Sequence, residues 1–325
     1  MTLLEVKNLR VEFPTRRGTL LAIDDVSFSI EPGEVLGVVG ESGAGKSLTG
    51  ASIIGLLEPP GRIAAGEIWL ERERIDNLPY DEMRRIRGKK IGAIFQDPLT
   101  SLNPLYTIGK QLTETIMVHS EMTPSVARAR AIELLGEVGI PAAKARIDSY
   151  PHEFSGGMRQ RVVIALALCA DPRLVIADEP TTALDVSIQA QIIALLKRLC
   201  HDHKTAVMLI THDMGVIAET ADRVAVMYAG RIAEIGQVRD VIKHAKHPYT
   251  EGLMGSIPVP GHDVDQLQQI AGSMPRLTEI PDGCAFNPRC PHVRDKCFDA
   301  RPELMPTDGA SMAACWVYER EAALV

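Results

Sequence analysis

Gly40-Glu41-Ser42-Gly43-Ala44-Gly45-Lys46-Ser47 is the stretch that decides the fold of this chain. It matches G-x-x-x-x-G-K-[ST], a pattern whose glycines let the backbone wrap a phosphate group at the N-terminus of a helix. Lys46 can reach the β- and γ-phosphates of a nucleotide, and the Ser47 hydroxyl can bind Mg²⁺. The preceding apolar run EVLGVVG predicts a buried parallel strand, and the following SLTGASIIGLL predicts a helix. The sequence therefore predicts a strand, a phosphate-binding loop and a helix in succession.

Two neighbouring carboxylates supply a second element that nucleotide hydrolysis needs. The apolar run Leu174-Val175-Ile176-Ala177 leads into Asp178 and Glu179. A buried strand here would deliver both side chains to the carboxyl edge of a parallel sheet, where ligands bind. We expect Asp178 to bind Mg²⁺ through water and Glu179 to orient and polarise the attacking water. The alternative, a solvated acidic pair at a strand end, is less favoured beside a phosphate loop.

Strand and helix patterns alternate along most of the chain, which indicates an α/β fold with a parallel sheet. The pattern over residues 1–39 predicts strands, and a helix-rich insertion over about 105–170 predicts a separate lobe. Residues 223–236 predict a hairpin. After about residue 250, Pro, Gly and Cys become frequent and the periodicity fades. We therefore expect one domain over residues 1–250 and a small extension over residues 251–325.

Composition narrows the class of function. The chain has 325 residues, a formal net charge of −7 and 46% apolar residues, so it can bury a substantial core. An acidic balance disfavours nucleic-acid binding, which selects basic surfaces. No apolar run reaches the roughly 18–20 residues that span a bilayer, and the N-terminus lacks the pattern of a secretory signal. We expect a cytoplasmic protein, which other proteins would have to hold in place if it works at a membrane.

A further motif separates this chain from other ATPases, namely Phe154-Ser155-Gly156-Gly157-Met158-Arg159-Gln160-Arg161. Ser-Gly-Gly at a helix start is a second anion-binding arrangement, in a chain that already has one phosphate loop. Here the sequence resembles the ABC ATPase family over residues 3 to about 240, and this stretch resembles the family's signature motif. The resemblance implies a P-loop cassette with a RecA-like parallel sheet, an N-terminal antiparallel β subdomain and a helical signature subdomain.

The same resemblance assigns roles to individual residues. It implies two chains that sandwich two ATP molecules head to tail, so the signature residues of one chain contact the ATP of its partner. Catalysis falls to Glu179 and His212, the latter resembling the switch histidine, and Asp185 resembles the D-loop aspartate. Phe13 would stack on adenine. The alternative readings are an ordinary aromatic at Phe13, a plain strand-end amide at Gln96, a turn acid at Asp185 and a strand-end histidine at His212. The implied ATP set is Phe13, Gly40, Ser42, Gly43, Gly45, Lys46, Ser47, Gln96 of the Q-loop and Asp178, with Mg²⁺ held by Ser47, Gln96 and Asp178; the signature set is Ser155, Gly156, Gly157 and Gln160.

The C-terminal part is similar to one subfamily. His247-Pro248-Tyr249-Thr250, a Pro-rich stretch and a group of cysteines resemble the ATPases of oligopeptide and dipeptide importers, whose relatives carry nickel or glutathione. The resemblance implies two transmembrane permease subunits, a second and related ABC ATPase, and an extracytoplasmic solute-binding protein, with no nucleic acid. It places the chain peripherally on the cytoplasmic face of the cell membrane. Import of another solute, or a non-transport ABC ATPase, are the alternatives.

The six cysteines fall into two groups. Cys169 and Cys200 lie in helical patterns and are expected to be buried small hydrophobes. The other four have the spacing C-x5-C-x6-C-x17-C, which suits a [4Fe–4S] cluster and tetrahedral Zn²⁺ equally, and His292 is a spare candidate ligand. Free or disulfide-bonded cysteines are the structural alternative. The subfamily resemblance favours the [4Fe–4S] cluster, with the ligands Cys284, Cys290, Cys297 and Cys315.

Overall fold

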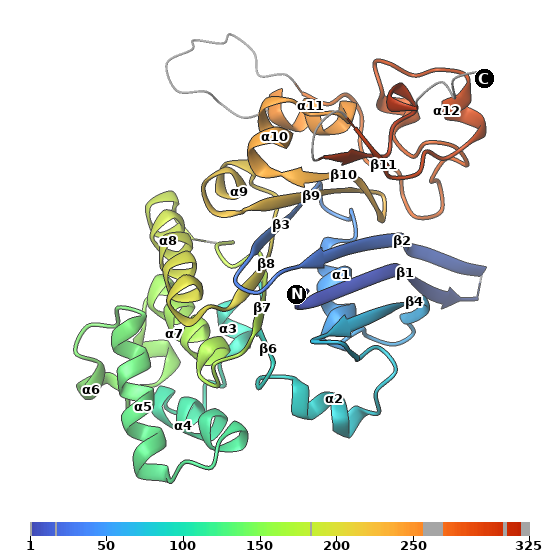
Figure 1. The fold of residues 1–325 in the computed structure, drawn as a ribbon. Coiled ribbons are helices and arrows are strands. Elements are labelled where there is room, and N and C mark those ends of the chain that lie inside the picture. The colour runs from blue at the N-terminus through green and yellow to red at the C-terminus, as the bar shows by residue number, and fades with distance from the viewer. Residues whose placement is uncertain (1, 17, 183, 256–268, 308–310, 320–325) are drawn as a thin grey trace. The chain divides into compact units, whose positions relative to one another are not determined.

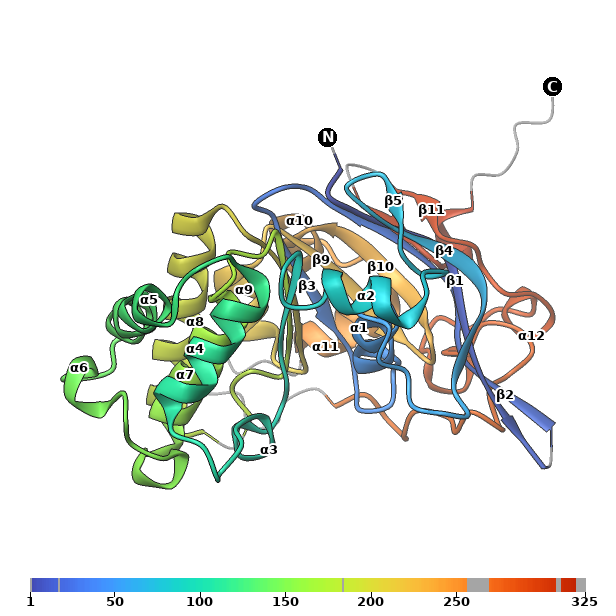
Figure 2. The same ribbon diagram turned by 90° about the horizontal axis from the view of Figure 1, so that it is seen from below.

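The backbone forms two compact units in a computed structural model that describes residues 2–16, 18–182, 184–255, 269–307 and 311–319. Figures 1 and 2 label the helices and strands of both units. The first unit comprises Met1–Leu3, Ile30–Val35 and Asn77–Ile210. The second comprises Leu4–Ser29, Leu36–Asp76 and Thr211–Val325. A domain boundary near residue 250 stays a prediction from the sequence.

A parallel sheet forms the core of the first unit. Strand β7 (Leu174–Asp178) pairs with β6 (Ile91–Ile94) on one side and with β8 (Ala206–Thr211) on the other, and both pairings are parallel. Residues 174–177 are all buried, as the continuous apolar run predicts for a strand that is covered on both faces. The carboxyl ends of these strands carry the polar residues described below.

Helices make up the rest of the first unit. Figure 1 shows α4, α5, α6 and α7 gathered together in green. The Thr107 side chain caps α4 by accepting from the Lys110 N–H, and Pro124 starts α5, where its missing N–H has no helical partner to lose. The helices are α2 (Tyr80–Ile86), α3 (Pro98–Ser101), α4 (Ile108–His119), α5 (Pro124–Glu137), α6 (Ala143–Arg146), α7 (Gly156–Leu168) and α8 (Val186–His203), with the 3₁₀ turn η1 (Pro151–Glu153).

The second unit contains an antiparallel sheet with the order β2-β1-β4-β5. Its strands are β1 (Leu4–Thr15), β2 (Gly18–Ile30), β4 (Arg62–Leu70) and β5 (Glu73–Arg74). Figure 2 shows β1 and β4 running beside each other. Buried and exposed residues alternate along parts of β1 and β2, as expected for a sheet with one face against a core.

A second set of strands in this unit has the order β11-β12-β10-β9-β3. Strand β9 (Arg223–Tyr228) runs parallel to β3 (Val35–Val39) and antiparallel to β10 (Arg231–Gln237), so the hairpin predicted over residues 223–236 is present. Ala229 and Gly230 form its two-residue turn, both with positive φ. Sequence reasoning missed the short strands β11 (Met305–Pro306) and β12 (Met312–Ala313), which extend the sheet from β10.

The helices of the second unit are short. They are α1 (Lys46–Ile53), α9 (Met214–Thr220), α10 (Val238–Lys243), α11 (Pro248–Gly255) and α12 (Lys296–Asp299), with the 3₁₀ turns η2 (Asn287–Arg289) and η3 (Trp316–Tyr318). Across the described parts of both units, no helix combines the length and the apolar character that crossing a bilayer requires.

Two glycines in the first unit offer a matched test of its packing. A Cβ added at Gly92, in β6, would overlap the backbone carbonyl oxygen of Ala167, whereas one added at Gly136, in α5, would meet nothing within 4 Å. We expect Gly92→Ala to lower the free energy of unfolding by about 1–3 kcal/mol through overpacking. Gly136→Ala should leave it unchanged or raise it by up to about 1 kcal/mol. Urea unfolding of both variants checks this, and equal effects would contradict the β6–α7 packing.

Candidate functional site

The phosphate loop joins β3 to α1 in the second unit. A Cβ at Gly40 would overlap the carbonyl oxygen of Met227 on β9, so only glycine allows the chain to turn there. Gly43 and Gly45 have φ values of 84° and 101°, in the region that disfavours other residues. Gly45 directly precedes α1, and Ser42 is exposed. The glycines required by the sequence motif therefore have a steric reason in the fold.

The motif lysine is held inside this loop. Lys46 is 5% exposed. Its ammonium group donates to the carbonyl oxygens of Gly40 and Glu41, at 2.8 and 3.0 Å. Ser47 follows in the first turn of α1 with its side chain exposed. An ammonium group and an exposed hydroxyl beside a loop of backbone amides suit a phosphate with its metal ion.

Phe13 lies near the end of β1 and is half-buried. Its ring edge lies 2.7 Å from the point where a Cβ at Gly61 would stand, so the missing side chain of Gly61 makes room for the ring. A ring in this position remains partly accessible for stacking.

The carboxylates of the first unit lie at the end of β7. Asp178 is opposite Ile210 of β8 in the parallel register, and the next N–H, that of Glu179, donates to the Ile210 carbonyl oxygen. Glu179 has a φ of 45°, which is uncommon for a residue with a Cβ. The two carboxylates therefore occupy the strand edge that the sequence predicts, but the second is held in a strained backbone conformation.

Gln96 and Thr182 orient the Glu179 carboxylate. The Oε2 atom of Glu179 accepts from the Gln96 amide nitrogen at 3.2 Å and from the Thr182 hydroxyl at 2.8 Å. The sequence suggested Gln96 but not its contact with Glu179, which joins residues 83 positions apart. It missed Thr182 altogether, although a threonine three residues beyond Glu179, in a tight turn, was a usable signal.

The signature residues begin α7. The Ser155 hydroxyl caps the helix by accepting from the Met158 N–H at 3.4 Å, and Ser155 and Gly156 are exposed. Gly157 lies so close to Ile188 of α8 that an added Cβ would be 2.9 Å from it. The Gln160 side chain is buried, and its Nε2 atom has no hydrogen-bond partner among the described residues. The helix start is thus accessible to an anion, whereas Gln160 is directed into the protein.

Asp185 and His212 follow the neighbouring strands β7 and β8, respectively, in the sequence. Asp185 caps α8, and its pKa is lowered because its carboxylate accepts from the Ile188 N–H and the Ser187 hydroxyl. Ala183, quoted with Asp185 in the D-loop resemblance, lies outside the described residues. His212 directly follows β8 and is exposed. Phe13, the phosphate loop and His212 belong to the second unit, and the other predicted ATP-site residues to the first.

The four C-terminal cysteines lie near one another in the second unit. Burial, together with the nearby thiols of Cys297, Cys315 and Cys290, raises the pKa of Cys284 to about 11. Burial also raises the pKa values of Cys290 and Cys315. All six cysteines are free thiols, and Cys169 and Cys200 are buried, as predicted. No group of three or more His, Cys, Asp or Glu in the described residues is arranged to hold one metal ion.

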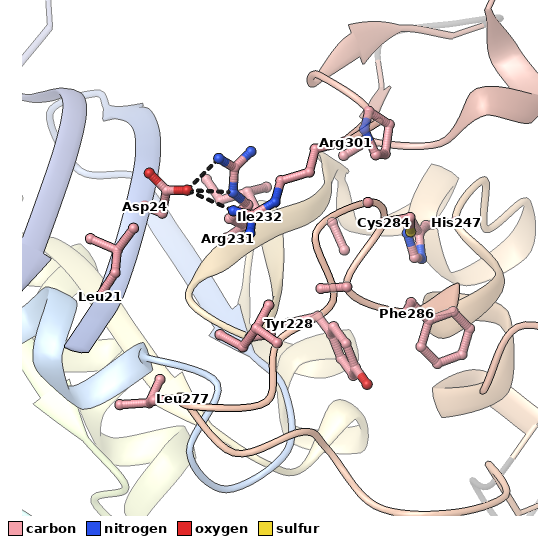
Figure 3. Close-up of a pocket in the computed structure, with 17 residues that line it drawn as sticks. Leu21, Asp24, Tyr228, Arg231, Ile232, His247, Leu277, Cys284, Phe286 and Arg301 are labelled. Atoms are coloured by element: carbon pink, nitrogen blue, oxygen red, sulfur yellow. Dashed lines mark hydrogen bonds and ion pairs between the residues drawn. The ribbon is translucent and has the colours of Figure 1, made fainter. Parts of the chain in front are cut away.

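A cavity of about 170 Å³ lies beside this segment, and Figure 3 shows its lining. Asp24 of β2 accepts from Arg231 of β10 and from Arg301, which carry the dashed lines in Figure 3. Burial alone would raise the pKa of Asp24, but hydrogen bonds and charge from Arg231 and Arg10 outweigh burial and lower it. These ion pairs join β2 to β10 and to the C-terminal segment within the second unit.

Comparisons with known proteins agree with these motifs. A family model described as ABC transporter matches residues 23–182, and one described as Oligopeptide/dipeptide transporter, C-terminal region, matches residues 233–297. The oligopeptide transport ATP-binding protein AppD of Bacillus subtilis is 48% identical over 99% of this chain and 98% of its own length. The dipeptide transport ATP-binding protein DppD of Escherichia coli is 45% identical over 95% of each chain.

A solved structure shows the same fold. The ATP-binding cassette MJ0796, as a dimer in a post-hydrolysis state bound to ADP and Pi, is 29% identical, with a TM-score of 0.65 over 73% of this chain and 99% of that one. The chain therefore belongs to the ABC transporter family and, within it, to the ATP-binding proteins of oligopeptide and dipeptide transporters.

Proposed function

We propose that this chain is the ATP-hydrolysing subunit of an importer that takes di- and oligopeptides across the cytoplasmic membrane. The observation that carries the proposal is the Glu179 carboxylate, oriented by Gln96 and Thr182 at the end of β7. An intact phosphate loop with Lys46 and Ser47 accompanies it. The relatives' names, oligopeptide and dipeptide transport ATP-binding proteins, support peptides as the solute.

ATP binding is assigned to the residues that the family resemblance selects. Phe13 would stack on adenine, and the backbone amides around Gly40, Ser42, Gly43 and Gly45 would surround the phosphates. Lys46 would leave its loop carbonyls for the phosphate oxygens. Ser47, Gln96 and Asp178 offer hydroxyl, amide and carboxylate oxygens, the ligand types that Mg²⁺ prefers. A bound Mg²⁺ would neutralise phosphate charge.

Hydrolysis is assigned to Glu179 and His212. Glu179 would hold and polarise the attacking water, while Gln96 and Thr182 keep its carboxylate in one orientation. His212 would contact the γ-phosphate of the same ATP. Ser155 and Gly156, exposed at the start of α7, would contact ATP held by a second ATPase, together with Gly157, and Asp185 would lie near that interface. The Gln160 side chain, predicted as part of this set, is buried and would not make the contact.

The partners follow from the subfamily. Two transmembrane permease subunits, a second related ABC ATPase and an extracytoplasmic peptide-binding protein would complete the importer. The chain would sit peripherally on the cytoplasmic face of the membrane. The two ATPases would be held together by the ATP molecules between them, and hydrolysis would release that contact. Other switches that depend on a γ-phosphate drive movement in the same way.

A [4Fe–4S] cluster is proposed for the cysteine group. Four thiolates suit this cluster or Zn²⁺, and the proposal rests on the subfamily resemblance. Cys284, Cys290, Cys297 and Cys315 are free thiols near one another, but among the described residues they are not arranged around a metal ion. The raised pKa of Cys284 means that its thiol is protonated at neutral pH until a metal displaces the proton. The group would stabilise a segment with little core of its own.

Replacing Glu179 tests the assignment of the base. Glu179→Gln keeps the hydrogen-bonding shape but removes the negative charge that polarises water, so kcat for ATP should fall by about 10²–10⁴-fold. ATP binding should persist and leave the nucleotide trapped. Glu133→Gln, which changes a mostly exposed carboxylate on α5, is the control. Near-normal turnover by Glu179→Gln would show that another group is the base.

Metal analysis tests the cysteine assignment. Anaerobic purification should yield a brown chain with about four irons and four sulfides, as a [4Fe–4S] cluster requires. Cys290→Ser should lose most of both, whereas Cys200→Ser, at a buried cysteine of α8, should retain them. A colourless chain with about one zinc would overturn the cluster, and a metal-free chain would overturn the metal site.

A further inference from the structure

Glu41, inside the phosphate loop, is held by two residues from the C-terminal part of the chain. Its backbone N–H donates to the Tyr249 hydroxyl at 2.9 Å. Its carboxylate accepts from Arg289 at 3.0 Å. Its carbonyl oxygen accepts from Lys46, also at 3.0 Å. Glu41 therefore links the phosphate-binding lysine to a segment more than 200 positions away.

Tyr249 is rigidly placed to make its contact. It is 0% exposed, and its ring packs on Tyr228 of β9 and on Phe286, with centroid distances of 4.7 and 5.5 Å. Its N–H donates to the His247 Nδ1 atom at 3.0 Å. Figure 3 shows Tyr228, Phe286 and His247 in the wall of the cavity beside β10.

A buried carboxylate anchors the turn that carries Tyr249. Glu234 of β10 is 0% exposed. Its carboxylate accepts hydrogen bonds from the backbone N–H groups of Lys246 and His247, both at 2.9 Å. Burial raises the pKa of Glu234, and these N–H groups counteract part of that effect. The start of α11 is thereby fixed to the sheet, and Tyr249 with it.

Arg289 reaches the loop from the cysteine segment. Its side chain is 6% exposed, and it also donates to the carbonyl oxygens of Ala271, Ile270 and Gly272. Burial alone would lower the pKa of Arg289, but the hydrogen bonds and charges of Glu41 and Tyr228 outweigh burial and raise this pKa. A buried guanidinium without its carboxylate is strongly unfavourable. Glu41 is therefore a required partner for Arg289, and Arg289 in turn restrains Glu41.

We propose that Tyr249 and Arg289 are positioning residues for ATP binding, which hold the phosphate loop in its binding conformation through Glu41. The inference deepens the proposed ATPase function and rests on it. A loop that is already ordered loses less conformational entropy when it closes on phosphates, so it binds more tightly. The C-terminal segment would thus act on nucleotide affinity rather than on the chemical step.

Tyr249→Phe is the sharpest test, because it removes the hydroxyl and keeps the buried ring. Titration of the purified full-length chain with fluorescent ATP should show a Kd about three- to tenfold higher, the size expected for one lost hydrogen bond. The KM for ATP should rise by the same factor, with kcat within about twofold. Tyr318→Phe, at another tyrosine of the C-terminal segment, should leave both unchanged.

A cycle of variants separates the two contacts. Arg289→Met should raise the Kd in the wild-type background but add nothing after Glu41→Ala, because its carboxylate partner is already gone. Tyr249→Phe should still act after Glu41→Ala, because the backbone N–H remains. Arg289→Lys should recover part of the affinity, since it restores the charge without the planar donor geometry.

Melting temperatures measured on the same samples distinguish a positioning role from a merely structural one. A lower melting temperature with unchanged Kd and KM in Tyr249→Phe and Arg289→Met would overturn the inference while leaving the ATPase function intact. Failure of the wild-type chain to bind ATP would overturn both. Lys46→Ala, which removes the phosphate-binding amine, marks the level of lost binding against which the smaller effects are measured.

Discussion

A buried ammonium group is the constraint on which the nucleotide site depends. Moving the amine of Lys46 out of water is costly unless acceptors replace the water. The carbonyl oxygens of Gly40 and Glu41 supply them, and they face the amine because the chain turns tightly against β9, where Gly40 leaves no room for a Cβ. The same contacts keep a cation in a loop whose amides are also suited to anions. ATP phosphates can therefore replace carbonyl acceptors without leaving the charge unpaired.

In the first unit, Glu179, the proposed base, is held in place through both its backbone and its side chain. A positive φ at a residue with a Cβ costs of order 1–2 kcal/mol, so the surrounding contacts must hold it. The Glu179 N–H pairs with β8, while the side chain is held by Gln96 and Thr182. Backbone and side chain are thus fixed by different neighbours. A carboxylate oriented in this way loses little freedom when it binds a water, which is the purpose of a prearranged base.

Local motifs were predictable from the sequence because they encode backbone conformation over a few residues. The glycines around Lys46, the apolar run before Asp178 and the capping Ser155 each act within one turn or strand. The contacts between Gln96 and Glu179 and between Tyr249 and Glu41 join residues 83 and 208 positions apart, and only packing brings them together. The His247-Pro248-Tyr249-Thr250 motif marks the subfamily in the sequence, but only the fold shows that Tyr249 contacts Glu41.

The two contacts on Glu41 differ in chemistry, so pH and salt affect them differently. The pKa of Tyr249 is raised by burial, so its hydroxyl stays neutral and accepts the Glu41 N–H at any pH near neutrality. The Arg289 pair is ionic, but with the Arg289 side chain 6% exposed and the Glu41 side chain 28% exposed, it is screened by salt less than a surface pair. Neither contact depends on the other's charge state. A segment that joins the loop through one neutral and one ionic contact therefore keeps Glu41 in place over a wider range of conditions than either contact alone.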